Sequence, residues 1–164
     1  MQTFLPYKDF IQTAKVLDYR RLGKQRVEAL QIHNIITGKQ KTNGWVNHPA
    51  VNMWRGYPEA LALYHDSMIH EWVARGYKNS MAYLSPKASQ SGVFYPNVDY
   101  RLPSGHHRLS EGKATIQLPS WVSDQALHQQ YKTLLLQKDY QFYKAFWPTP
   151  INYKEHEFIW PNSV

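Results

Sequence analysis

The strongest constraint on the fold is a helical repeat of apolar side chains between Pro58 and Gly76. Large apolar residues recur there at intervals of three or four: Leu61, Tyr64, Met68 and Trp72. Because one helical turn takes 3.6 residues, this spacing places them on one face. Proline suits the first turn of a helix and glycine suits its end. We therefore predict a core helix in this segment.

Weaker signals predict further helices on both sides of it. A helical region runs from about Asp9 to Thr37, bent near Gly23, and a short one covers 48–56, capped by Asn47 or His48. A last helix starts near 120–123, and a shorter one follows through residue 146. Residues 77–118 have little periodicity, and the tail from residue 147 reads as extended and packed down. The 164 residues thus predict an all-α, mostly helical fold in one compact domain, 1–164, with long irregular loops.

Residues 17–30 combine this helical character with an unusual density of charge. Arg20, Arg21, Lys24 and Arg26 fall within seven positions, and Glu28 follows. On a helix, three of these cations and Glu28 lie near one face. Clustered cations repel one another, so an anionic partner explains them better than stability does, although a solvated basic face remains the alternative. The apolar residues of the stretch are predicted to turn toward the core: Leu22, Val27 and Leu30.

The distribution of charge suggests a phosphate-binding surface. Of the net charge of +7, five units come from residues 1–41 and two from residues 79–119. In the central loop, His106, His107 and Arg108 are candidate DNA contacts, and adjacent histidines without a third ligand are a poor metal site. Trp54 is a candidate wedge and Arg55 a candidate phosphate clamp. For Trp54 the alternative is a place in the core.

Several classes of protein are disfavoured by what the sequence lacks. It contains no cysteine, no apolar run of about 20 residues and no charged start followed by an apolar stretch. It also lacks the glycine-rich phosphate loops and the HExxH zinc motif. We therefore expect no membrane association, no metal and no cofactor, in a cytoplasmic protein that is a monomer.

The α-amine of Met1 is a candidate nucleophile. An α-amino group has an ordinary pKa near 8, against about 10.4 for lysine, so more of it is unprotonated near neutral pH. Such an amine can attack a sugar C1′, displace the base and form a Schiff base. Gln2 is too bulky for the usual removal of the initiator methionine. The alternative is that Met1 merely starts the chain.

Several strings resemble the pyrimidine-dimer DNA glycosylase/AP lyases of the phage endonuclease V type. The first matches are the terminus, Tyr19-Arg20-Arg21-Leu22, Arg26-Val27 and Gly38-Lys39, and a second lies between Asp66 and Gly76-Tyr77. Longer strings are similar to bacterial and phage members of this group. They are residues 1–7, 20–31 and 47–57. The resemblance covers about residues 1–78.

This resemblance implies an endonuclease V-like helical domain that bends double-stranded DNA, flips out a base and attacks C1′ with its terminal amine. Met1 matches the nucleophile by position, and Arg20 and Arg26 match arginines that contact DNA. The setting would be the cytoplasm of a bacterial cell or a phage-infected host. The chain departs from the family at Arg21, which stands where the catalytic glutamate is found, and Glu28 is the nearest replacement, with Asp18 as the other.

The function predicted is a DNA repair glycosylase with AP lyase activity that flips a damaged pyrimidine, a pyrimidine dimer. Its catalytic residues would be Met1, Glu28 and Arg21, and its DNA contacts would include Lys24. Two alternatives stay open: an enzyme acting on a modified or hypermodified base in DNA, and a non-catalytic DNA-binding module.

Overall fold

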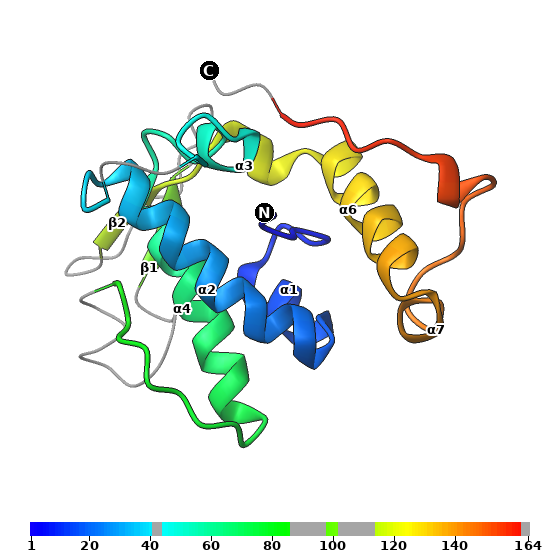
Figure 1. The fold of residues 1–164 in the computed structure, drawn as a ribbon, viewed down its shortest axis with the longest axis horizontal. Helices are drawn as coiled ribbons and strands as arrows, with labels where there is room; N and C mark the ends of the chain where they lie inside the picture. The colour runs from blue at the N-terminus through cyan, green and yellow to red at the C-terminus, as the bar shows by residue number, and fades with distance from the viewer. Residues whose placement is uncertain (41–43, 86–97, 102–113, 162–164) are drawn as a thin grey trace.

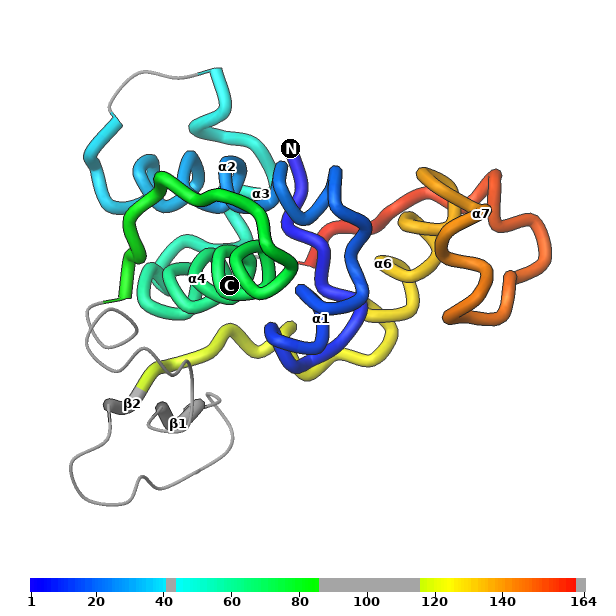
Figure 2. The backbone as a smooth tube through the Cα atoms, turned by 90° about the horizontal axis from the view of Figure 1, so that it is seen from below, coloured from blue at the N-terminus to red at the C-terminus, as the bar shows by residue number. Residues whose placement is uncertain are grey.

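The computed structural model describes residues 1–40, 44–85, 98–101 and 114–161, and it is mostly helical, as predicted. Two long helices, α2 (Tyr19–Ile36) and α4 (Pro58–Ala74), pack together, and α1 (Phe10–Val16) packs on α4. On the other side of the N-terminal segment lie α6 (Gln125–Lys138) and α7 (Tyr140–Tyr143), as Figures 1 and 2 show. The first residues of the chain therefore run between two helical groups.

Helix α4 is the centre of the core, and the predicted helix from Pro58 is confirmed. Every residue from 60 to 69 is buried, so this part of the helix is covered on all sides rather than on one face, while residues 70–74 are partly or fully exposed. Gly76 follows it with a φ of +92°, a left-handed conformation that favours glycine. Polar residues such as Asp66 are buried with it. Both Asp66 carboxylate oxygens accept backbone N–H groups, from Leu84 at 2.8 Å and from Ser85 at 2.7 Å.

The predicted bend near Gly23 is wrong. The chain breaks instead at Leu17 and Asp18, which have extended backbones, and Asp18 caps the start of α2. Helix α2 runs through Gly23 without a break. Glycine is needed at this position because Trp72 packs against it, and a Cβ there would be 2.9 Å from the Trp72 ring. Val27 was also misplaced, since it is 45% exposed, whereas Leu22 is buried as predicted.

The helical elements on either side of α4 follow their sequence signals, whereas two short strands and a turn in the tail were not predicted. Helix α3 (Pro49–Asn52) begins after His48, whose Nδ1 accepts the Ala50 N–H at 3.0 Å. A 3₁₀ turn, η1 (Ser120–Ser123), precedes α6, which is capped by Asp124. Two short strands, β1 (Val98–Arg101) and β2 (Ala114–Gln117), pair in parallel in the register Val98 to Ala114. A second 3₁₀ turn, η2 (Tyr153–Glu155), lies in the tail.

Aromatic rings pack η1 and the residues after α3 against α4, and they pack the tail against α6. The Trp54 ring lies 4.8 Å from that of Trp121 and 5.7 Å from that of Tyr64. The tail packs down as predicted, with the Phe158 ring 4.6 Å from the Tyr131 ring. Within the described residues, no helix is long and apolar enough to cross a membrane.

Candidate active site

A pocket of about 650 Å³ lies between the start of the chain, helix α2 and the junction of α6 and α7. One side consists of residues from the first 28 positions, including Met1, Gln2, Arg20, Arg21, Lys24 and Glu28. The other side consists of Lys138, Asp139 and Phe142. The structure thus brings together all three predicted catalytic residues and two of the predicted DNA contacts.

Glu28 lies beside the terminal residue of the chain. Its Oε2 accepts the backbone N–H of Gln2 at 3.1 Å, and its Oε1 lies 3.4 Å from Lys24 Nζ. Only 8% of Glu28 is exposed, although it lines the pocket. Because the Gln2 peptide immediately follows Met1, this bond holds the carboxylate one residue from the α-amine.

Gln25 fixes this arrangement, and sequence reasoning missed it. The side chain is fully buried, and its Oε1 accepts the Phe4 N–H at 3.0 Å. Its Nε2 donates to Gln2 O and to Glu28 Oε2, both at 3.0 Å. Tyr64 Oη lies 2.6 Å from Gln25 Oε1 as well. The detectable signal was position, since Gln25 falls three residues after Leu22 and three before Glu28, on a face that is otherwise buried.

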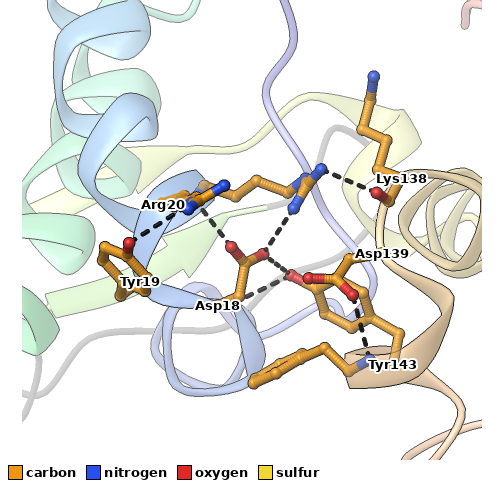
Figure 3. A network of polar contacts seen from close by, with 8 residues as sticks. Asp18, Tyr19, Arg20, Lys138, Asp139 and Tyr143 are labelled. Atoms are coloured by element: carbon orange, nitrogen blue, oxygen red, sulfur yellow. Dashed lines mark hydrogen bonds and ion pairs between the residues drawn. The ribbon is translucent and has the colours of Figure 1, made fainter.

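Arg21 takes part in a second network with Asp18, Lys138 and Tyr143, all three of which are labelled in Figure 3. Its Nη1 donates to Asp18 Oδ1 at 3.2 Å, and its Nη2 donates to the Lys138 carbonyl at 3.2 Å. Tyr143 Oη donates to the same Asp18 oxygen and accepts the Asp18 N–H at 3.0 Å. These bonds join the start of α2 to the end of α6 and to α7.

The same network decides the charge of Asp18. Burial alone would raise the pKa of its carboxyl, but the hydrogen bonds from Tyr143 and Arg21 and the Arg21 charge outweigh burial and lower it. Burial and the Asp18 carboxylate together raise the pKa of Tyr143, which stays a phenol. Asp18 is therefore an ionised structural group, and Glu28 is the carboxylate that binds the Gln2 N–H, one residue after the amine.

Three further cations, on Arg20, Lys24 and Lys138, line the pocket, together with one further carboxylate, that of Asp139. Lys24 has 72% of its side chain exposed, and Arg20 is exposed next to it on α2. Arg20 Nε donates to Tyr19 Oη at 3.1 Å, and Tyr19 is itself 51% exposed. Cations and an exposed aromatic ring at one opening suit a phosphate backbone and its bases.

His48 lies within electrostatic range of the pocket. Burial lowers the pKa of its imidazole, the charge of the terminal amine lowers it further, and Glu28 opposes them. Its ring lies between those of Trp45, at 5.1 Å, and Trp160, at 5.6 Å. The structure assigns His48 the helix-capping role that its position before Pro49 indicates.

Three predicted DNA contacts lie outside the pocket lining: Arg26, Arg55 and Trp54. The Arg26 guanidinium lies 4.0 Å from the centre of the Trp72 ring, and its Nη1 donates to Asn79 Oδ1 at 2.9 Å. Arg55 is exposed, and its guanidinium donates to Asn52 Oδ1 and to a backbone carbonyl of the preceding loop.

Trp54 requires a correction. It is fully buried, and its Nε1 donates to Thr3 Oγ1 at 2.9 Å, so no face of the ring is open to a DNA base. The core interpretation of Trp54 holds and the wedge interpretation does not. His106, His107 and Arg108 lie outside the described residues.

The chemistry available in the pocket follows from its groups. A primary amine one residue from the N–H group that binds a buried carboxylate can attack an electrophilic carbon while the carboxylate takes up a proton or stabilises positive charge. The surrounding cations suit an anionic substrate that positions the reacting carbon.

Comparison with protein families gives one match. A family model described as pyrimidine dimer DNA glycosylase matches residues 1–84, slightly more than half of the chain. No curated protein and no solved structure matches. The matched residues hold Met1, Gln25 and Glu28, whereas Lys138, Asp139 and Phe142 lie outside them.

Proposed function

Since the chain belongs to the pyrimidine dimer DNA glycosylase family, we propose that it excises a damaged pyrimidine with the α-amine of Met1 and then cleaves the strand as an AP lyase. One observation carries the proposal. The Gln2 N–H, next to that amine, binds the Glu28 carboxylate in a pocket surrounded by cations.

The proposed first step exchanges one bond for another at the sugar. The amine nitrogen of Met1 bonds to C1′ as the bond from C1′ to the base breaks, and the base leaves with the electron pair and takes up a proton. Glu28, which forms an ion pair with Lys24, stabilises the positive charge that develops on the sugar and accepts the proton released by the amine. Ring opening then gives a Schiff base.

The proposed second step is a β-elimination. Removal of a proton from C2′ of the Schiff base expels the 3′ phosphate, and hydrolysis of the imine releases the enzyme. Arg20, Lys24 and Arg21 hold the DNA phosphates near the pocket in this scheme, because phosphate contacts position a duplex without reading its sequence. The Arg21 guanidinium is fixed to Asp18, so its proposed role is electrostatic rather than proton transfer.

A modified base is the second candidate substrate, and one observation favours it. The wall formed by Lys138, Asp139 and Phe142 comes from outside the residues that match the family, so the chemistry and the choice of base rest on different parts of the chain.

Borohydride trapping tests the proposal. The protein is incubated with duplexes that carry a cyclobutane pyrimidine dimer or an abasic site, and covalent adducts are counted on a denaturing gel. Wild-type protein should form an adduct on both. A one-residue extension before Met1, and Glu28→Gln, should each reduce trapping at least 100-fold, while Glu59→Gln, an exposed carboxylate on α4, should not.

Each other outcome has a defined meaning. Trapping on the abasic duplex alone would assign the lyase step and point to a different base. Binding without trapping on either duplex would refute the amine mechanism and favour a DNA-binding module, whose affinity would fall steeply with salt.

A further inference from the structure

We propose that the part of the pocket lining formed by Lys138, Asp139 and Phe142 is a base-binding site, and that Phe142 is the side chain on which the extruded base stacks. This inference rests on the proposed function, because it assumes that DNA enters the pocket. It assigns a specificity role to the junction of α6 and α7, which lies outside the residues that match the family.

Phe142 has the exposure expected of a stacking residue. It lines the pocket and is 40% exposed, although an apolar ring of that size is usually covered in a folded protein. Met1 and Glu28 line the same pocket, so in this proposal a base lying on Phe142 has its sugar within the pocket that contains the amine. The positive charge of Arg20, Lys24 and Lys138 complements the attached phosphates.

Contacts with neighbouring residues hold the Phe142 ring in place. The next residue, Tyr143, is fully buried, and its ring lies 4.9 Å from that of Phe142 at an angle of 76°. The Tyr143 ring stacks on that of Trp147 at 5.4 Å, and its hydroxyl donates a hydrogen bond to Asp18, the N-cap of α2. Asp139 Oδ1 accepts the Phe142 N–H at 3.2 Å. A stacking surface fixed in this way loses little conformational entropy when a base binds.

Phe146 provides a matched control. It is 51% exposed, its ring lies 5.6 Å from that of Phe142, and it does not line the pocket. A general contribution of exposed apolar surface to DNA binding would involve both phenylalanines, whereas a base-binding wall involves Phe142.

The test measures binding without chemistry. Fluorescence anisotropy gives the affinity for two duplexes that differ at one unpaired position. One carries 2′-fluorothymidine, whose glycosidic bond resists cleavage, and the other carries a tetrahydrofuran spacer that has no base. Stacking of a base on an aromatic side chain corresponds to roughly tenfold in affinity. Wild-type protein should therefore prefer the duplex with the base by about that factor.

In Phe142→Ala the ratio of the two affinities should fall toward one. Phe142→Trp should restore it, and Phe146→Ala should keep the wild-type ratio. A wild-type ratio near one, or an equal fall in both alanine variants, would overturn the proposal. Borohydride trapping on an abasic duplex is measured in parallel, so a failure of the amine mechanism is seen there and leaves the affinity ratio as an independent result.

Discussion

Gln25 offers the sharpest test of how the amine and the carboxylate are held together. Gln25→Met keeps the length and the helix propensity of the side chain and removes its polar atoms. The Phe4 N–H and the Gln2 carbonyl then lose their partner. Tyr64 keeps Phe4 O at 2.6 Å as an acceptor, and Glu28 keeps Gln2 and Lys24.

The expected cost follows from the groups left unpaired. Phe4 is 4% exposed, so its N–H has no ready access to solvent, and the Gln2 carbonyl is partly buried. An unsatisfied buried polar group costs about 1–3 kcal/mol, so the two groups together should lower the free energy of unfolding by roughly 2–6 kcal/mol. Borohydride trapping should fall with it, because the first residues of the chain lose their anchor on α2.

Urea unfolding, followed by circular dichroism at pH 7, measures this loss. Gln31→Met is the matched control, since Gln31 lies on the same helix and is exposed. It should change the free energy of unfolding by no more than about 0.5 kcal/mol. If Gln25→Met unfolds within that same margin of wild type, the interpretation of Gln25 as the residue that holds the terminal segment is refuted.

Three further predictions concern the stability of the fold. Tyr143→Phe removes the hydroxyl bonded to the Asp18 carboxylate and should cost about 1.5–3 kcal/mol in urea unfolding at pH 7, the range for hydrogen bonds to charged groups. Gly23→Ala places a Cβ 2.9 Å from the Trp72 ring. The cost of overpacking, about 1–3 kcal/mol, should outweigh the roughly 1 kcal/mol gained in helix propensity, so the melting temperature should fall. Burial lowers the pKa of the His33 imidazole, so as pH falls the unfolded chain takes up a proton near pH 6.5 before the native protein does. The free energy of unfolding should therefore fall as the pH drops below about 6.5, and it should fall less steeply in His33→Asn.

Each of these predictions has a control on the same molecule. Tyr140→Phe alters an exposed phenol and should cost less than Tyr143→Phe. Gly44→Ala adds a Cβ that meets nothing within 4 Å and should leave the melting temperature within about a degree of wild type. His156→Asn removes an exposed imidazole, so the pH dependence of stability should stay that of wild type. Equal effects in a variant and its control would contradict the physical reason given.

The helices and the cation cluster were predictable because local spacing determines them. Proline and glycine marked the limits of α4, and the position of His48 before a proline marked the start of α3. The bend assigned to Gly23 failed because propensity treats glycine as a weak point. Here it is the space into which Trp72 packs, a contact between residues 49 positions apart.

Only the part of the candidate site that comes from residues 1–28 was predictable from the sequence. Met1, Arg21 and Glu28 were chosen from local charge and from the family resemblance, and the pocket contains all three. Gln25 has no charge to draw attention to it, and its role depends on the terminal segment that lies across α2. Phe142 could not be chosen from the sequence, because its place in the same pocket as Glu28 depends on the long-range hydrogen bond between Asp18 and Tyr143.

The division of the pocket between two ends of the chain has an evolutionary consequence. If the junction of α6 and α7 binds the base as proposed, mutations there change which nucleotide is accepted while the residues proposed for the chemistry stay intact, so relatives that share the first 84 residues can diverge in substrate without passing through an inactive ancestor. Exchange of residues 125–146 between such relatives should transfer lesion preference as a single module.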